Sequence, residues 1–298
     1  MLRQRTVAGP AGIRGIGLHS GEDVRMVLRP APEDAGVVFR RVDLDPVLAI
    51  PARSENVGAT RLSTSLQGAG EHVATVEHLL AALFGLGVDN AYVDISAAEL
   101  PIMDGSAAPF VQLVRGAGVV ELEAPRRFVR IVREVWVEEG DKYAGFIPFD
   151  GFKIAFTIDF DRPVVREQVA HVELDFSAVS FIEELSGART FGFVEQVEAL
   201  RAGGMARGGS FDNAVVVDEH RVLNRGGLRS PDEFVKHKVL DAMGDLYLMG
   251  CGMLGEFRAY KSGHTLNNAA VRALLARPDA WELVTWDDPS RTPFLREW

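Results

Sequence analysis

The segment 236–245 carries a histidine and two carboxylates at helical spacing. His237 and Asp241 are four residues apart, and Asp245 lies four residues further on. Side chains four apart on a helix project from the same face on successive turns, so an imidazole nitrogen and a carboxylate oxygen can reach one cation together. A hydrogen-bonded structural pair would use the same spacing. The segment therefore predicts either a metal-binding helix or a structural polar pair.

A third ligand could come from His78, about 160 residues upstream of His237. A catalytic zinc site takes three protein ligands and leaves one position for water. Two imidazoles and one carboxylate, from His78, His237 and Asp241, suit zinc better than magnesium or calcium. The adjacent Glu77 points in a different direction but can flank a metal as a base. The alternative for Glu77 and His78 is a surface carboxylate beside a histidine at the edge of the core.

A further histidine and a hydroxyl could transfer protons or stabilise charge. His264 follows a glycine in a short turn, and Asp245 could hydrogen-bond it and hold it protonated, because a neighbouring anion raises the pKa of an imidazole. The alternative for His264 is a place near a helix N-terminus, satisfied by backbone groups. Thr190 could support an oxyanion or cap a helix. His19, which lies among small residues, is expected in the wall of a cleft.

The rest of the chain supplies helices and strands to position these residues. Apolar residues at helical spacing, bounded by glycine or proline, predict helices at 71–86, 107–115, 189–201, 266–275 and from Pro231 past His237. Alternating apolar residues predict strands at 24–28, 90–96, 129–137, 152–160, 213–217 and 255–260. The glycine-rich stretch 203–210 fits no phosphate-binding fingerprint and is expected to be a flexible loop.

The two halves of the chain show a similar order of elements. His78 and His237 each lie on a predicted helix that is followed by a strand and a turn. The charged, proline-containing segment 121–127 separates the halves, which predicts domains at 1–124 and 125–298. Two such units would suit a metal site between domains.

The composition is that of an ordinary globular protein, with 47% hydrophobic and 25% charged residues among 298. A formal net charge of −10 argues against general nucleic-acid binding, which depends on neutralising phosphates. The single cysteine, Cys251, excludes an intramolecular disulfide and suits a reducing, cytoplasmic setting. No apolar run approaches the roughly 20 residues that span a bilayer, so neither a transmembrane segment nor a signal peptide is expected.

Six motifs, taken together and in their order along the chain, resemble one family. They are GLHSG (17–21), TVEHL (75–79), PIMDGSAAPF (101–110), ARTFGF (188–193), HKVLDAMGDL (237–246) and KSGH (261–264). The set is similar to the zinc-dependent UDP-3-O-acyl-N-acetylglucosamine deacetylases of lipid A biosynthesis, and the resemblance covers nearly the whole chain. It implies an α+β hydrolase of two tandem β-α-α-β domains, with helices packed between the sheets and a βαβ-like insert in the second domain.

The resemblance also implies a role for each catalytic candidate. It implies one zinc ion per chain, with iron(II) possible in the cell, held by His78, His237 and Asp241. Glu77 is implied as the general base, and His264 as the general acid that protonates the departing sugar amine. An electrostatic partner for this acid, and aids to the oxyanion and the substrate, are implied at Asp245, Thr190 and Lys238. Opposite protonation states of Glu77 and His264 predict a bell-shaped pH profile.

Two substrate subsites follow from the same resemblance. The insert, at about 193–217, would form a passage for the acyl chain, lined by Phe193, Val194, Val197, Leu200 and Val216. The uridine diphosphate would lie near Lys142, Asp159, Phe160, Lys238 and Lys261. Phe160 equally suits a core position at the end of its strand. The expected substrate-binding set is completed by Leu62, Phe191 and His19. Arg61 replaces an apolar residue of the family, which changes the expected cleft but leaves the catalytic residues intact.

The sequence therefore predicts a cytoplasmic enzyme of a Gram-negative bacterium that acts, as a monomer, on a small UDP-sugar with one acyl chain. Two alternatives remain open. The first is a zinc amidohydrolase that acts on a different acetylated sugar or amide, which an acyl passage would distinguish. The second is a non-catalytic metal-binding protein. The presence of both Glu77 and His264 argues against the second, since binding alone needs neither a base nor an acid.

Overall fold

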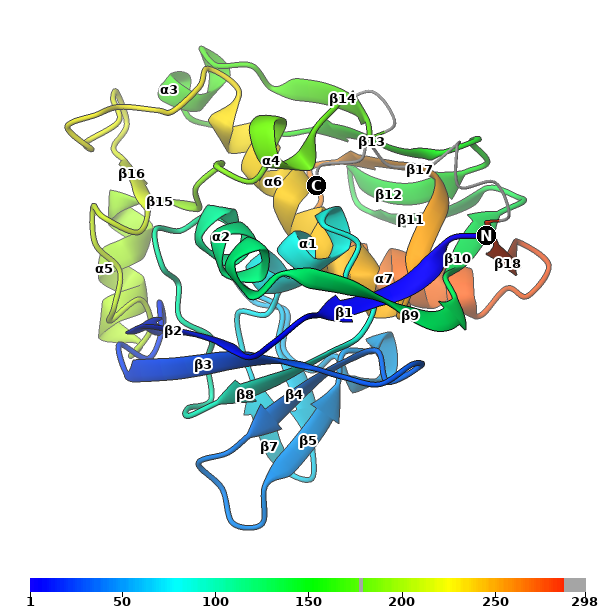
Figure 1. The fold of residues 1–298 in the computed structure, drawn as a ribbon. Helices are drawn as coiled ribbons and strands as arrows, with labels where there is room; N and C mark the ends of the chain where they lie inside the picture. The colour runs from blue at the N-terminus through cyan, green and yellow to red at the C-terminus, as the bar shows by residue number, and fades with distance from the viewer. Residues whose placement is uncertain (177–178, 287–298) are drawn as a thin grey trace.

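Two β-sheets enclose a layer of helices (Figure 1). The computed structural model describes residues 1–176 and 179–286, so the end of the expected second domain, 287–298, lies outside the described residues. Within them the chain has the α+β fold that its sequence predicted. One hydrophobic core includes Leu80 from the first half of the chain and Leu240 from the second. The division into domains at 1–124 and 125–298 stays a prediction.

The first sheet is formed by the N-terminal third of the chain. Its strands, in spatial order, are β2 (Ala11–Ile16), β3 (Asp23–Pro30), β8 (Ala91–Ile95), β4 (Val37–Arg41) and β5 (Leu48–Pro51). Val24, Met26 and Leu28 alternate with more exposed residues along β3 and are buried, which confirms the predicted strand. The side chains of Met26 and Leu28 join the core, so this face of the sheet covers the helix layer.

The second sheet has seven strands arranged around β17 (Gly252–Tyr260). Its main path is β11 (Val135–Glu139), β12 (Lys142–Ile147), β17, β10 (Arg127–Ile131) and β18 (Trp281–Thr285). Two further strands extend from β17: β13 (Phe152–Thr157) and β14 (His171–Asp175). β17 runs parallel to β10 and β13 and is buried over most of its length. β13 ends at Thr157, so Phe160 lies beyond the strand that was expected to contain it.

Four helices fill the space between the sheets (Figure 1): α1 (Glu77–Gly85), α2 (Ala108–Ala117), α6 (Glu233–Leu246) and α7 (His264–Leu275). α1 and α6 cross closely at Gly244, where a Cβ atom would lie 2.1 Å from the carbonyl oxygen of Glu77. This close approach requires glycine and brings the polar residues of the two helices within reach of each other. Among the described residues, every helix is too short or too polar to cross a membrane.

Two of the predicted helices begin with short strands instead. Glu71–Val73 form β7, which pairs with β6 (Leu66–Gly68) through a turn whose two residues have positive φ angles. Consequently α1 begins only at Glu77. Likewise, the first part of the helix predicted at 189–201 is β15 (Phe191–Phe193), and α5 (Val194–Ala202) follows it. Each strand depends on a partner outside its own periodic stretch, which the local pattern does not reveal.

The insert has the predicted βαβ form. β15 pairs in parallel with β16 (Val215–Val217), and α5 connects the two strands. The unit begins at Phe191, two residues before the predicted start. The segment expected to hold the domain boundary is mostly strand, because β9 (Val119–Pro125) pairs with β1 (Arg3–Val7). The remaining short elements are η1 (Ser54–Asn56), α3 (Pro163–Arg166), α4 (Phe181–Glu184) and η2 (Tyr247–Met249).

Candidate active site and metal centre

Helices α1 and α6 bring the predicted metal ligands together. His78 is the second residue of α1, while His237 and Asp241 lie one turn apart on α6. All three are buried, and ligand atoms from the three side chains lie within 4.8 Å of one another. Nε2 of His78 is 3.5 Å from Oδ1 of Asp241, and Nε2 of His237 is 3.3 Å from the same oxygen. The three side chains therefore converge on a single point.

The hydrogen bonds of His237 and Asp241 leave two acceptors facing each other. Nδ1 of His237 lies 3.1 Å from the carbonyl oxygen of Ala188, so Nδ1 carries the hydrogen and Nε2 carries the lone pair. Oδ1 of Asp241 has no hydrogen-bond partner among the described residues, whereas Oδ2 accepts a 2.6 Å hydrogen bond from Lys238. Two buried acceptors in contact are unfavourable unless a cation lies between them. The residues present therefore fit a bound metal ion.

Burial and local charge hold these ligands in the protonation states that metal binding requires. Burial lowers the pKa of His237 to about 3, although Asp241 opposes the change, so the ring is neutral at pH 7. Burial alone would raise the pKa of Asp241, but His237 and Lys238 hold this pKa well below its ordinary value. A ligand must be deprotonated to bind a metal, and both groups meet this condition.

His264 and Asp245 form a buried pair beside the metal ligands. Nδ1 of His264 is 2.9 Å from Oδ2 of Asp245. Burial opposes the charge on His264, but Asp245 outweighs it and raises the pKa of the ring to about 9. His264 is the first residue of α7, so of the two positions that the sequence left open, a short turn and a place near a helix N-terminus, the second is correct. At neutral pH this histidine is a cation and can donate a proton.

Glu77 approaches the same centre from the first residue of α1. Its Oε1 lies 4.0 Å from Nε2 of His264, and its Oε2 accepts a 3.0 Å hydrogen bond from the backbone N–H of Thr64. Burial raises the pKa of Glu77, against the opposing effects of His264 and His78. A carboxylate with a raised pKa beside a cationic imidazole has the properties of a base and acid pair.

A second set of possible ligand atoms, from Glu77, Asp241 and His264, overlaps the first. It is a poorer metal site. The cationic state of His264 disfavours coordination, since a ligand must lose its proton. The set of two histidines and Asp241 is therefore the better candidate.

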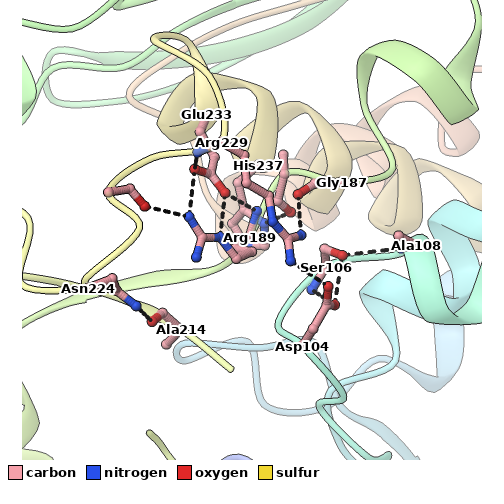
Figure 2. A network of polar contacts seen from close by, with 12 residues as sticks. Asp104, Ser106, Ala108, Gly187, Arg189, Ala214, Asn224, Arg229, Glu233 and His237 are labelled. Carbon is pink, nitrogen blue, oxygen red and sulfur yellow. Dashed lines mark hydrogen bonds and ion pairs between the residues drawn. The ribbon is translucent and has the colours of Figure 1, made fainter. Parts of the chain in front are cut away.

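A polar network positions the segment that contacts His237, as Figure 2 shows. Glu233, which is fully buried on α6, accepts hydrogen bonds from Nε of Arg189 at 2.7 Å and from the backbone N–H of Arg189 at 3.1 Å. It also accepts the backbone N–H of Arg229 at 2.6 Å. The Arg229 guanidinium reaches Asp104, after β8, at 2.8 Å. Through charge-assisted hydrogen bonds, this network connects α6 to the 187–190 segment and to the turn that contains Asp104.

The 187–190 segment carries two groups of the site. Its Ala188 carbonyl accepts the hydrogen bond that orients His237. Its Thr190 donates a 2.8 Å backbone hydrogen bond to Gly105 and accepts another from Val215 in the insert. Thr190 is therefore fixed through its main chain, which leaves its side chain free to face the cavity that it lines.

The metal ligands, Glu77 and His264 line one cavity of about 490 Å³. Its wall also contains the substrate-binding and oxyanion candidates from the sequence: His19, Leu62, Lys142, Phe160, Thr190, Phe191, Phe193, Lys238 and Lys261. Asp245 lies behind His264, and Asp159 reaches the site only through its ion pair with Lys261. Several further wall residues had no role assigned from the sequence, among them Thr75, Ile102 and Gln196, although Thr75 and Ile102 lie within two of the six motifs.

Two of the three lysines proposed for the substrate, Lys238 and Lys261, already have partners. Nζ of Lys238 is bonded to Asp241, so this lysine lies next to the metal site. Nζ of Lys261 lies 2.7 Å from Asp141 and 2.9 Å from Asp159, and both carboxylates raise its pKa. Phe160 packs against Phe191, with ring centroids 5.5 Å apart, at the cavity wall rather than in the core. Lysines and an aromatic ring in one wall suit an anionic ligand that carries a ring.

A second cavity, of about 530 Å³, lies under the insert. Its wall contains four of the predicted passage residues: Val194, Val197, Leu200 and Val216. The fifth, Phe193, lines the first cavity instead. The cavities share wall residues, among them Leu18, Leu62 and Phe191. Helix α5 has no buried residue, so its apolar side chains border this cavity and not the core. Phe211, which no sequence pattern singled out, also lines this cavity and is 57% exposed.

An α+β protein whose buried histidines and aspartate meet beside a carboxylate and a cationic histidine is a metal-dependent hydrolase. The comparisons with known proteins agree. Residues 4–276 match the family model for LpxC, described as UDP-3-O-acyl N-acetylglycosamine deacetylase. The chain therefore belongs to the LpxC family of deacetylases, which are metalloenzymes that hydrolyse an amide bond. This confirms the resemblance seen in the six motifs.

Individual relatives match over almost their entire length. The UDP-3-O-acyl-N-acetylglucosamine deacetylase of Pseudomonas entomophila is 58% identical over 293 residues, which cover 98% of this chain and 97% of the relative. The proteins of the same name from Hahella chejuensis and Marinobacter nauticus are 58% and 59% identical, and 98% of this chain is covered in each case.

Proposed function

We propose that this protein hydrolyses the acetamide of UDP-3-O-acyl-N-acetylglucosamine, which gives acetate and the free sugar amine, as a step of lipid A biosynthesis. One observation carries the proposal. A buried set of two histidines and an aspartate lies beside Glu77 and His264 in a cavity that borders an apolar one of about 530 Å³. The first cavity suits amide hydrolysis and the second suits an acyl chain.

The metal of this site is proposed to be zinc, one ion per chain, held by His78, His237 and Asp241. Two imidazole nitrogens and a carboxylate oxygen favour zinc, although iron(II) would accept the same ligands. When bound, the ion would polarise the acetamide carbonyl and make water more acidic. Metal analysis of the purified protein tests this assignment. Zinc near one equivalent per chain would support zinc as the bound metal, whereas iron in place of zinc would identify the metal as iron(II).

The reaction then needs one proton removed and one proton supplied. Glu77, in its carboxylate form, takes a proton from the water that adds to the acetamide carbon. Thr190, which lines the same cavity, would donate a hydrogen bond to the developing oxyanion. As the C–N bond breaks, His264 donates its Nε2 proton to the sugar nitrogen, which would otherwise leave as an unstable anion. Asp245 favours the cationic form of His264 before this transfer.

The two cavities assign the ends of the substrate. The acyl chain would lie against Val197, Leu200 and Val216 in the cavity under the insert, where α5 leaves apolar side chains unburied. The uridine diphosphate would lie along the wall formed by Lys142, Phe160 and Lys261. These assignments account for an apolar wall in one cavity and a wall of lysines and an aromatic ring in the adjoining one.

The substrate proposal is tested by comparing two sugars that differ only in the acyl chain. Acetate release from UDP-3-O-acyl-N-acetylglucosamine should have a much larger kcat/KM than release from UDP-N-acetylglucosamine. Equal values for the two sugars would favour the alternative, a zinc amidohydrolase that acts on another acetylated sugar or amide.

Replacing Leu200 with tryptophan should lower kcat/KM for a long-acyl substrate by roughly tenfold or more, because the indole would occupy space that the chain needs. The matched control is Ala199→Trp, which places the same side chain at an exposed position of α5 outside the cavity wall. Both variants should keep their metal. Unchanged activity of Leu200→Trp, or an equal loss in the control, would contradict the passage assignment.

A further inference from the structure

Thr64 contacts both the base helix and the acid pair, although no motif drew attention to it. Its backbone N–H donates a 3.0 Å hydrogen bond to Oε2 of Glu77, and its hydroxyl donates a 2.5 Å hydrogen bond to Oδ1 of Asp245. Its carbonyl oxygen accepts the N–H of Val76, just before α1. Thr64 is fully buried. One residue thus hydrogen-bonds two carboxylates that are separated by 13 and 181 positions from it.

The hydroxyl of Thr64 completes the set of donors around Asp245. Oδ2 of this aspartate faces Nδ1 of His264 at 2.9 Å and accepts a 2.9 Å hydrogen bond from Nδ2 of Asn267. Thr64 supplies a donor to the other oxygen, Oδ1. Donors on both oxygens prevent the carboxylate from rotating about its own axis, so Oδ2 stays directed at the imidazole.

The backbone N–H of Thr64 fixes the orientation of the Glu77 carboxylate. It binds Oε2, so Oε1 is left on the side of the cavity, 4.0 Å from Nε2 of His264. A second contact supports this arrangement, since the hydroxyls of Thr60 and Thr265 lie 2.8 Å apart and join the same loop to α7. The loop before β6 is therefore connected to α1, α6 and α7 around the reaction centre.

We infer that Thr64 is a positioning residue, which aligns the general base and the partner of the general acid through one side chain and one backbone N–H. The inference rests on the proposed function, because it assumes that Glu77 and His264 transfer the protons. Its role is indirect: the hydroxyl fixes Asp245, and Asp245 fixes His264. Loss of the hydroxyl should therefore slow the chemical step without weakening substrate binding.

The test uses the metal-loaded protein and the variants Thr64→Val, Thr64→Ser and Asp245→Asn. Valine has the shape of threonine but lacks the hydroxyl, while the backbone hydrogen bond to Glu77 is kept. Thr64→Val should lower kcat by about 10- to 100-fold, the effect of a lost hydrogen bond to a charged group, with KM and metal content unchanged. Thr64→Ser should stay within about threefold of the native protein. In the Asp245→Asn background, Thr64→Val should add less than about threefold.

Several results would overturn the inference. If Asp245→Asn and Glu77→Gln are impaired but Thr64→Val is within threefold of the native protein, the inference fails and the proposed function stands. Equal losses in Thr64→Val and Thr64→Ser with a lowered Tm would show a purely structural role. Normal turnover of Glu77→Gln would refute the proposed function itself, and the inference with it. Should Thr64→Val not fold, Thr64→Ala removes the same hydroxyl and is judged against the same serine variant.

Discussion

The Glu77→Gln protein should be nearly inactive with its metal still bound, whereas His78→Ala should lose both metal and activity. The two residues are adjacent at the start of α1 and both are buried, so they form a matched pair. Glutamine keeps the shape of glutamate and can accept no proton from water, which should cost roughly 10²- to 10⁴-fold in kcat. Alanine at position 78 leaves two of the three proposed ligands, too few for a stable zinc site.

Steady-state kinetics and metal analysis of the same preparations distinguish the two roles. Retention of the metal by Glu77→Gln is expected because the carboxylate lies outside the proposed set of two histidines and Asp241. Normal turnover in Glu77→Gln would show that another group acts as the base. Full metal content in His78→Ala would instead point to the overlapping set formed by Glu77, Asp241 and His264.

Local spacing predicted the part of the site that one helix carries. His237, Asp241 and Asp245 follow the period of a helix, and α6 places them accordingly, although its other sides are buried as well. Because catalytic zinc sites use three protein ligands, a third ligand was expected, and His78 was predicted. In the structure a ring nitrogen of His78 lies close to the ligand atoms of His237 and Asp241. Helices of this length could be predicted because their hydrogen bonds and periodicity are local.

Contacts between distant segments could not be predicted in the same way. Thr64 and Glu233 are common residue types, and their importance depends on partners that only the folded chain brings near. The short strands β7 and β15 were predicted as helix for the same reason, since each is stabilised by a strand outside its own periodic stretch. The apolar residues of α5 suit a core equally well by pattern, and only the fold shows that they border a cavity.

The basic limb of the pH profile should belong to His264, whose proton is consumed in the reaction. Asp245 overcomes the effect of burial and raises the pKa of this ring to about 9, so activity should fall as the pH rises through about 9. Glu77 must be unprotonated, and burial raises its pKa above the ordinary value, so activity should also fall as the pH drops through that raised value. Replacing His264 with glutamine should remove the basic limb and lower kcat by roughly 10²- to 10⁴-fold.

The substitution Asp245→Asn removes the negative charge that raises the pKa of His264. The imidazole is retained, but burial now acts without an opposing anion, so the pKa of His264 should fall and the basic limb should move to lower pH by about one to three pH units. The acidic limb should move much less, because burial, His264 and His78 all act more strongly than Asp245 on the pKa of Glu77. Profiles of kcat/KM for the native protein and Asp245→Asn, recorded at equal metal content, measure both limbs. A basic limb that stays in place would assign it to a group other than His264, whereas a shift of this limb alone would identify the histidine as the proton donor to the departing amine.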